Sequence, residues 1–382
     1  RWAEPLQDFL EKEGTRPFLD FYGAVLAAMA QHDAETMAFY QAHVEDLEAV
    51  YMERYPDAHG EMRVLWEALD RHASGEEQRA ALSWPRVFLA QLHMQITNIG
   101  PRLGECTSVV AQLPTGMLHA RNWDFGPEPG ALGTASVSVD FHSSGTGNFT
   151  CLLALTHIAK WTTCVKPRAF SMSLNARGFG DGHERGRTAA EELRLLRQGH
   201  LPRVEVLRRV MRAESFGQAV GVAAASRPLT SMYVILGAAD PREGGAVVTL
   251  EGNGSSADVM PMPGPAEADG WFLVQTNADH WVPMSQGAYS SHRREHVRGL
   301  MRALGPSATP EQVLGVLQDA TEYPAGNAGP DDGAVFRNST IASVLMSPGS
   351  GGACAASYRP LVWRALPGPG PAPGPQPEPL FA

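Results

Sequence analysis

The sequence predicts an α+β protein in which a helical N-terminal unit precedes a layered, strand-rich domain. Between residues 6 and 92, apolar side chains recur three or four positions apart, the spacing of one face of an amphipathic helix. After residue 105 the pattern changes to short runs rich in β-branched and aromatic residues, which are interrupted by helical stretches and then resume. Strands grouped before and after helices favour sheets covered by helices over alternating β-α-β units.

The first 105 residues are expected to form helices only. Apolar residues recur at helical spacing from Phe18 to Met29, so one side of this helix should be buried. Asp33 is placed to cap the next helix, with Glu35 in its first turn. Thr36 stands near the position where a capping box needs Glu or Gln, so we expect a cap without the complete box.

The remaining elements follow in groups. The first group consists of strands at 106–112, 117–123, 135–141, 149–156 and 169–174. Helices at 188–198, 203–211 and 217–225 come next, and then strands at 232–237, 246–250 and 271–276. The last group has helices at 292–304 and 310–320 and strands at 339–346 and 353–358. We therefore divide the chain into a helical unit (1–105), a catalytic α+β domain (106–366) and a disordered Pro/Gly-rich tail (367–382).

Composition and charge exclude several classes of protein. The 31 Lys and Arg residues are outnumbered by 41 Asp and Glu residues, a net charge of -10, which argues against nucleic acid as the main partner. Most of the acidic excess lies in the helical unit, which holds 18 acidic and 9 basic residues. Four cysteines are too few for a disulfide-built miniprotein or a zinc-finger array. Glycine-rich stretches lack the lysine of a phosphate-binding loop, so we expect no cofactor.

Three sequons bear on the compartment. Asn148, Asn253 and Asn338 each begin an Asn-X-Ser/Thr motif, which favours a glycoprotein of the secretory route, either lysosomal or secreted. No stretch approaches the ~20 apolar residues of a membrane-spanning helix.

Cys106 stands where the helical, acidic unit gives way to the first predicted strand. If the chain were cut before this residue, it would carry both a thiol and a free α-amine. An α-amine has a reference pKa of ~7.7–8.0 and is a usable base at mild pH, so the pair could act as nucleophile and general base. The alternative is a small buried residue in a first strand, because free cysteine is among the most buried residue types.

Four motifs in the same order resemble one family. They are Cys106-Thr-Ser-Val-Val-Ala with Ala120-Arg-Asn-Trp-Asp-Phe125, Phe170-Ser-Met-Ser-Leu-Asn175, Gln275-Thr-Asn-Ala-Asp-His-Trp281 with Arg293-Arg294, and Asn338-Ser-Thr-Ile-Ala. The chain thereby resembles the acid ceramidase and N-acylethanolamine-hydrolysing acid amidase family of N-terminal-nucleophile cysteine hydrolases. The resemblance implies an αββα sandwich preceded by a helical subunit.

The resemblance also implies roles for individual residues. Cys106 would be the nucleophile and, through its amine, the general base. Arg121 would orient the thiolate and the substrate carbonyl, and Asp124 would hold the α-amine. Asn277 would donate to the tetrahedral oxyanion, an interaction worth ~2.7–4 kcal/mol where one such donor is removed. Arg293 would complete the polar network.

Each of these residues has a structural alternative. Arg121 and Asp124 could form an ordinary ion pair, and Asn277 could be a turn residue. Arg293 could lie on a solvated helix face, and its neighbour Arg294 is the second candidate for the same position.

Arg121 and Asp124 are three positions apart, so a regular strand would direct them to opposite faces. We therefore predict a break or bulge near 122–123, which Gly126-Pro127 would permit, so that both can reach Cys106.

One position departs from the family pattern. The family has a glutamate where this chain has Ala176, and there that carboxylate balances the active-site arginine. The charge of Arg121 is then left to Asp124 or to another acid such as Asp181 or Glu184. Slow autocleavage or altered chemistry would follow.

The resemblance further implies a zymogen that cuts itself between Glu105 and Cys106, after which residues 1–105 stay bound as the partner in an α/β heterodimer. Protonation of the acidic unit near pH ~4–5 would weaken its repulsion from anionic membranes. Apolar helix faces near 18–29 and 88–94 could then contact lipid. Packing of these faces within the protein is the alternative.

Other functions stay open from the sequence. His292 and His296 match the H-x-x-E-H pattern of a zinc peptidase family, although a charged helix face explains this short match equally simply, and we expect no metal. An acyltransferase and a catalytically impaired lipid-binding homologue are further alternatives. Cys151, Cys164 and Cys354 remain beside Cys106, so at least one of them is unpaired.

The sequence therefore predicts a lipid amidase that acts through a Cys106 thioester. N-acylethanolamines or related fatty-acid amides are the first choice of substrate, and ceramide is the alternative.

Overall fold

The computed structural model describes residues 3–96, 106–125, 129–142, 147–157, 161–177, 187–252, 254, 256–282, 289–321, 334–337 and 339–349. The N-terminal part is helical, as predicted. Its helices are α1 (Ala3–Glu13), α2 (Arg16–His32), α3 (Ala34–Ala42), α4 (Val44–Arg54), α5 (Pro56–His72), α6 (Glu76–Ala81) and α7 (Trp84–Ile96). The Asp33 side chain accepts a hydrogen bond of 2.8 Å from the Thr36 backbone N–H, which confirms the predicted cap of α3.

Apolar faces of these helices are buried inside the protein. Phe18, Phe21 and Met29 of α2 and Phe88 and Leu92 of α7 belong to one large core cluster. The structure therefore favours the alternative, packing of these faces within the protein, because the apolar area is removed from water there. No helix in the described part of the chain is long and apolar enough to cross a bilayer.

The first sheet has four strands in the order β10-β1-β2-β11. They are β10 (Phe272–Gln275), β1 (Cys106–Leu113), β2 (Gly116–Asp124) and β11 (Thr340–Met346). Every pair is antiparallel, and the register places Cys106 opposite Trp123 and Ser108 opposite Arg121. Directly opposed residues of antiparallel strands share a face, so Cys106 and Arg121 point to the same side.

The second sheet has seven antiparallel strands in sequence order. They are β3 (Ser136–Phe141), β4 (Phe149–Ala154), β5 (Thr163–Lys166), β6 (Phe170–Ala176), β7 (Met232–Ala238), β8 (Gly245–Leu250) and β9 (Ala257–Pro261). The sequence did not predict β5, which is short and precedes a proline, or β9, which is exposed along most of its length as an edge strand. The mixed α+β class is confirmed.

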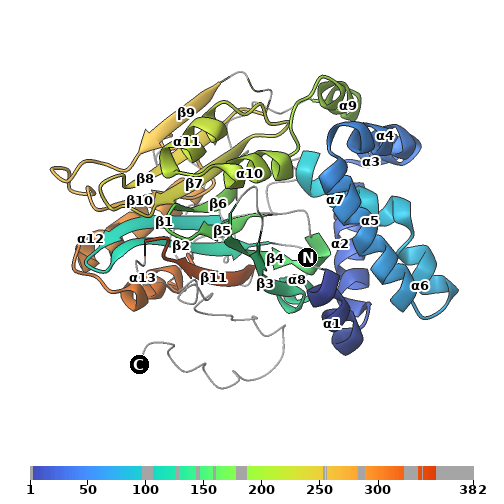
Figure 1. The fold of residues 1–382 in the computed structure, drawn as a ribbon, viewed down its shortest axis with the longest axis horizontal. Coiled ribbons are helices and arrows are strands. Elements are labelled where there is room, and N and C mark those ends of the chain that lie inside the picture. Colours follow the sequence, from blue (N-terminus) through green and yellow to red (C-terminus); the bar gives the residue numbers. More distant parts are fainter. Residues whose placement is uncertain are drawn as a thin grey trace.

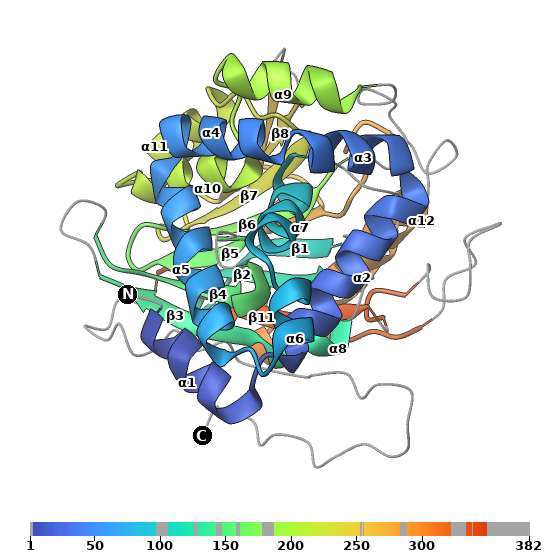
Figure 2. The same cartoon turned by 90° about the vertical axis from the view of Figure 1, so that its right-hand side faces the viewer.

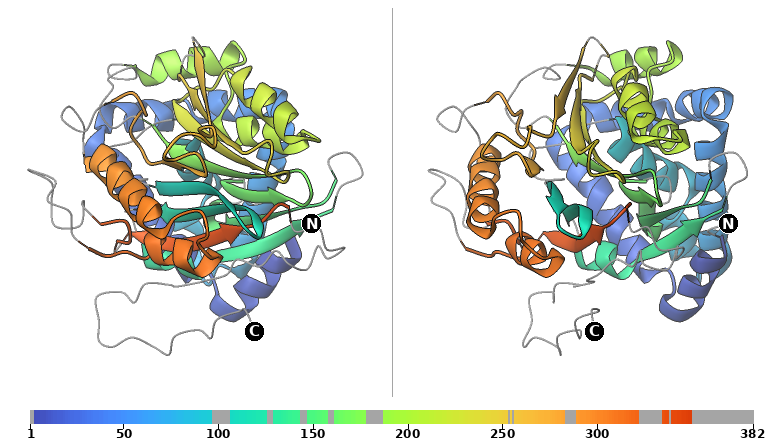
Figure 3. Two further views of the ribbon diagram at one scale, coloured as in Figure 1. Left: turned by 90° about the vertical axis from the view of Figure 1, so that its left-hand side faces the viewer. Right: turned by 60° about the vertical axis from the view of Figure 1, so that its left-hand side comes forward.

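The two sheets pack face to face, and helices cover their outer sides (Figure 1). Helices α12 (Tyr289–Leu304) and α13 (Pro310–Leu317) lie against the four-stranded sheet. Helices α10 (Arg203–Arg212) and α11 (Phe216–Ala224) lie on the far side, with α11 against β7 and β8, as the two views of Figure 3 show. Between the sheets, a Cβ at Gly245 would come within 2.8 Å of a Val110 methyl carbon, so glycine permits this close approach.

The helical unit covers one end of both sheets, in front of them in Figure 2. Helix α2 contacts α8 (Pro129–Thr134) and the 3-10 turn at Leu155–His157. The Tyr22 hydroxyl donates to the Thr156 carbonyl at 3.0 Å, and the Phe21 and Phe125 rings lie 5.8 Å apart. Helix α9 (Ala189–Arg197) packs against α3 and α4. The helical unit thus reaches the end of β2 where the candidate site lies.

Two predicted features fall outside the described residues: the strand at 353–358 and the tail at 367–382. The division of the chain into 1–105, 106–366 and 367–382 stays a prediction.

Candidate active site

Cys106 is the first residue of β1, and its thiol faces the space between the two sheets. Arg121 in the neighbouring strand β2 donates through Nη2 to the Cys106 Sγ at 3.1 Å. Both side chains are buried, Cys106 to 4% and Arg121 to 1% exposure. A guanidinium at this distance is placed to hydrogen-bond the sulfur, and the thiolate is the nucleophilic form of cysteine.

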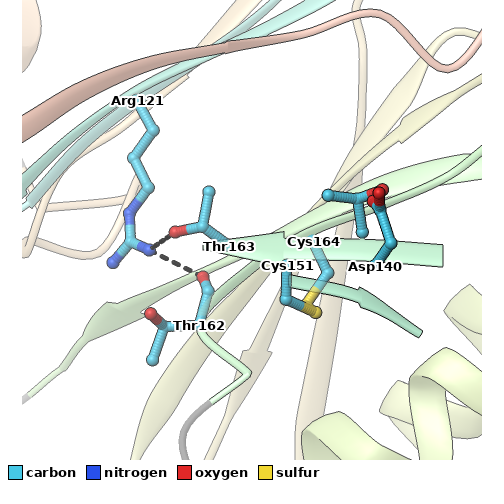
Figure 4. The surroundings of a disulfide bond; sticks show 7 residues. Arg121, Asp140, Cys151, Thr162, Thr163 and Cys164 are labelled. Atoms are coloured by element: carbon cyan, nitrogen blue, oxygen red, sulfur yellow. Dashed lines mark hydrogen bonds between the residues drawn. A yellow bond between two sulfur atoms is a disulfide. The ribbon is translucent and has the colours of Figure 1, made fainter. Parts of the chain in front are cut away.

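Arg121 is held by the second sheet. Nη1 donates to the Thr162 carbonyl at 2.6 Å and to the Thr163 hydroxyl (Figure 4). Nη2 donates to the Leu174 carbonyl. All of these acceptors are neutral. In the described part of the chain, Arg121 forms no ion pair with a carboxylate, which contradicts the structural alternative of an ion pair with Asp124.

The backbone N–H of Cys106 is held by Asn277, which follows β10. It donates to Asn277 Oδ1 at 2.8 Å, and the same oxygen accepts from Arg293 Nη2 at 2.8 Å. The other end of the amide, Nδ2, donates to the Ala176 carbonyl at 2.8 Å. Asn277 thus orients the nitrogen that would become the α-amine. The Nδ2 group carries two hydrogens, and the Ala176 carbonyl accepts one of them.

Of the two candidate arginines, Arg293 reaches the site. Its Nη2 lies 3.3 Å from the Cys106 carbonyl oxygen, and its side chain is fully buried, which contradicts the solvated-face alternative. Arg294 points elsewhere and donates to the carbonyls of Ala278, Asp279 and Val282.

Asp124 ends β2 on the face opposite Arg121. Strand β2 runs unbroken past 122–123, so the predicted break there is wrong, and the irregularity lies instead in β11 between Thr340 and Ala342. The Asp124 carboxylate accepts from the Thr340 hydroxyl at 2.7 Å and lies 3.5 Å from Arg337 Nη2. Strand alternation keeps this carboxylate away from the thiol. Asp124 was predicted to hold the Cys106 nitrogen. In this structure Asn277 accepts the hydrogen bond from that nitrogen instead.

Burial controls the protonation of Asp124. Removal from water raises the pKa of its carboxyl to about 6, although the nearby Arg293 charge and the Thr340 hydrogen bond act in the opposite direction. This carboxyl therefore changes charge in the mildly acidic range.

Ala176 is followed by an arginine that does have carboxylate partners. Arg177 donates to both oxygens of Asp279, at 2.6 and 2.8 Å, and its Nη1 lies 2.8 Å from Glu251. Asp279 also accepts from the Tyr233 hydroxyl at 2.7 Å. Asp181 and Glu184, the acids suggested for Arg121, lie outside the described residues, as does Glu105 at the expected cut.

A polar chain that the sequence did not reveal links the two sheets beside the thiol. The His119 ring nitrogens lie 3.0 Å from the Ser171 hydroxyl and 2.9 Å from the Ser173 hydroxyl. Ser108 contacts Ser173 at 3.0 Å and donates to Asn175 at 3.0 Å. Burial, with a smaller contribution from the Arg121 charge, lowers the pKa of His119 to about 3, so the imidazole stays neutral. The one available signal was that His119 and Arg121, two apart in a strand, share a face.

The zinc-peptidase histidines do not form a metal cluster in the structure. His296 Nε2 lies 2.5 Å from an Asp319 carboxylate oxygen. Within the described ranges, no group of three His, Cys, Asp or Glu side chains could hold a metal ion.

The disulfide pairing left open by the sequence is Cys151 with Cys164, which are directly opposed on β4 and β5. Cys106 is a free thiol, and Cys354 lies outside the described residues.

Comparison with known proteins shows which proteins the chain is similar to. No family model matches the chain. The chain is 33% identical over 244 residues to the N-acylethanolamine-hydrolyzing acid amidase of Rattus norvegicus, a match covering 63% of this chain and 60% of that protein. It is 32% identical over 247 residues to the Oryctolagus cuniculus protein of the same name, covering 64% and 62%. A probable acid ceramidase of Caenorhabditis elegans is 29% identical over 215 residues, covering 52% and 51%.

Among solved structures, a Caenorhabditis elegans N-acylethanolamine-hydrolyzing acid amidase ortholog is 26% identical, covers 64% of this chain and 93% of that chain, and gives a TM-score of 0.49. The comparisons confirm the resemblance to acid amidases and acid ceramidases that the motifs predicted. More particularly, the two N-acylethanolamine-hydrolyzing acid amidases are more similar to this chain than the probable acid ceramidase is. The chain spans about 60% of the length of these curated relatives.

Proposed function

We propose that this protein is an N-terminal-nucleophile cysteine amidase that hydrolyses the amide bond of N-acylethanolamines or related fatty-acid amides. One observation carries the proposal: Arg121 contacts the Cys106 thiol at 3.1 Å, while Asn277 orients the backbone nitrogen of the same residue at 2.8 Å. Thiol and nitrogen are thus both positioned at the start of β1. The two facing sheets with helices on both outer sides support the αββα sandwich of such enzymes.

Maturation would begin with attack of the Cys106 Sγ on the carbonyl carbon of Glu105. The peptide C–N bond breaks, the nitrogen gains a proton, and a thioester to Glu105 forms. This first step frees the α-amine of Cys106. Water then hydrolyses the thioester, which frees the thiol and the Glu105 carboxylate. Residues 1–105 would stay bound as a helical subunit, which the Phe21–Phe125 and Tyr22–Thr156 contacts support.

In each turnover the α-amine takes the thiol proton, and the Sγ attacks the carbonyl carbon of the lipid amide. The α-ammonium returns the proton to the leaving amine as the C–N bond breaks, leaving an acyl thioester. Water, deprotonated by the α-amine, hydrolyses the thioester to the fatty acid. Asn277 would donate to the oxyanion, Arg293 would hold Asn277, and Arg121 would favour the thiolate.

The choice of substrate rests on the relatives. Two amidases named for N-acylethanolamine hydrolysis match at 33% and 32% identity, against 29% for the probable acid ceramidase. Ceramide is the alternative substrate, and parallel assays with an N-acylethanolamine and a ceramide of the same acyl chain distinguish the two.

We infer a lysosomal or secreted location. A disulfide between neighbouring strands is typical of proteins made in oxidising compartments. Asn148, the first residue of a sequon, is exposed, so a sugar could be attached there.

N-terminal sequencing of the active, purified protein tests the proposal. A fragment that begins at Cys106, appearing together with activity, is the expected result. Full activity of an uncut chain would contradict the mechanism. Added amine that captures the acyl group faster than water does would instead indicate an acyltransferase.

A further inference from the structure

Arg121 is oriented by the first residues of β5. The Thr162 carbonyl and the Thr163 hydroxyl both accept from Nη1, while Nη2 contacts the Cys106 Sγ. Thr163 is the first residue of a strand of only four residues. Ends of secondary-structure elements are the parts that open most readily, so this holding point lies where a strand is weakest.

The Cys151–Cys164 disulfide crosslinks β5 one residue inside that end (Figure 4). Cys164 directly follows Thr163, and its partner Cys151 is directly opposite in β4, 13 residues away in sequence. Successive side chains of a strand point to opposite faces, so Thr163 faces Arg121 while the disulfide lies on the other face of the sheet. Both cysteines are fully buried. The crosslink therefore restrains the strand without touching the site.

The residues before β5 are restrained as well. The Trp161 ring lies 5.1 Å from those of Phe141 and Phe149, and the Arg208 guanidinium lies 4.6 Å from the Trp161 ring centre. Thr162 and Thr163 thus stand between an aromatic cluster and a covalent crosslink. Because the acceptors of Arg121 are neutral, its direction depends on hydrogen-bond geometry, which small movements of these acceptors would change.

We propose that the Cys151–Cys164 disulfide is a positioning element for catalysis, which holds Thr162 and Thr163 so that Arg121 stays directed at the Cys106 thiol. The proposal rests on the proposed function, in which Cys106 is the nucleophile. It assigns the disulfide an effect on the reactivity of the thiol beyond its effect on stability.

The test replaces both half-cystines in the full chain, C151A/C164A, and measures kcat, KM and the pH profile of Cys106 alkylation by iodoacetamide, followed on the Cys106 peptide by mass spectrometry. We expect kcat to fall by about 10- to 100-fold with KM little changed, as for a small misplacement of a catalytic group. The alkylation profile should move to higher pH by about one unit, because a displaced guanidinium favours the thiolate less.

Val139→Ala is the matched control. Val139 is buried in β3 directly opposite Cys151, so its truncation loosens the same edge of the sheet while the crosslink to β5 stays in place. Its Tm should fall while kcat and the alkylation profile stay at wild-type values. If C151A/C164A behaves in this same way, the disulfide only stabilises the fold and the proposal is wrong.

Two further variants sharpen the test, and the first of them keeps it decisive if C151A/C164A does not fold. Thr163→Val removes the hydroxyl acceptor on the Arg121 side and should shift the alkylation profile in the same direction; an unchanged profile would overturn the proposal. In an Arg121→Lys background, removing the disulfide should have little further effect, since interacting positions are non-additive, whereas fully additive losses would contradict action through Arg121.

Alkylation separates this proposal from the proposed function. If wild type shows no amidase turnover but C151A/C164A shifts the alkylation profile, the proposed function is refuted and the positioning effect is supported. If wild type turns over the lipid amide but C151A/C164A leaves the profile unshifted, the function is supported and the positioning effect is refuted.

Discussion

Arg121 and Arg177 are both buried beside β6, but their charges are compensated differently. Arg177 contacts two carboxylates, those of Asp279 and Glu251, so its positive charge is fully compensated by negative side chains. Arg121 contacts two carbonyls, a hydroxyl and a thiol. In the proposed mechanism, its positive charge is therefore available to a group that becomes negative only during the reaction. A buried ion pair serves the fold, whereas a buried cation among neutral acceptors is arranged in advance for a thiolate.

The largest expected effect comes from removing the thiol that Arg121 faces. Cys106→Ala should stay uncut and show no amidase activity, since nucleophile and maturation depend on one sulfur atom. Gel electrophoresis and a fluorogenic N-acyl substrate measure both. Cys106→Ser is the matched control, because it keeps a weaker nucleophile and should cut slowly. Cleavage of the alanine variant would disprove the mechanism.

The next effect distinguishes the two arginines by activity. Arg121→Gln should lower kcat by about 100- to 1000-fold, the loss seen when one preorganised donor is removed. Arg121→Lys keeps the charge but not the forked geometry, so its kcat should lie between those of Arg121→Gln and wild type. Steady-state kinetics on equal amounts of cut enzyme test this, and a kcat within a few-fold of wild type for Arg121→Gln would contradict the comparison.

Replacing Arg177 should lower stability, whereas replacing Arg121 should lower kcat. Arg177→Met leaves Asp279 and Glu251 without their cation and should lower the free energy of unfolding by about 3–5 kcal/mol. Urea denaturation followed by tryptophan fluorescence measures it. The double variant with Asp279→Asn should recover part of the loss. Stability equal to wild type would show that this cluster is not a structural ion pair.

The smallest effect concerns Asp124 and pH. Its pKa is raised to about 6 in the folded protein, so the folded state binds this proton more tightly than the unfolded state. Its contribution to stability is therefore greatest below pH ~4 and is lost as the pH rises towards about 6, by on the order of 2 kcal/mol. Thermal unfolding of wild type and Asp124→Asn across this range tests the sign. The variant should have a flatter profile, and an equal slope in both would contradict the assignment.

Local patterns were sufficient for much of the fold. Helical spacing in α2, the Asp33 cap of α3 and the strand that begins at Cys106 all depend on neighbouring residues. Strand β5 was missed because four residues carry little periodicity. The break expected in β2 was wrong, because Asp124 need not reach the thiol when Asn277 holds the Cys106 nitrogen.

By itself, the sequence was enough to place Cys106 at the junction of a helical unit and a strand-rich domain, and to select Arg121, Asn277 and Arg293 as its neighbours by resemblance. Only the tertiary structure decided which atoms meet: Asn277 at the nitrogen, Thr162 and Thr163 behind Arg121, and Cys151 with Cys164. The physical reason is that such contacts join segments far apart in the chain. Their geometry depends on strand register and on the packing of one sheet against another, which no local pattern records.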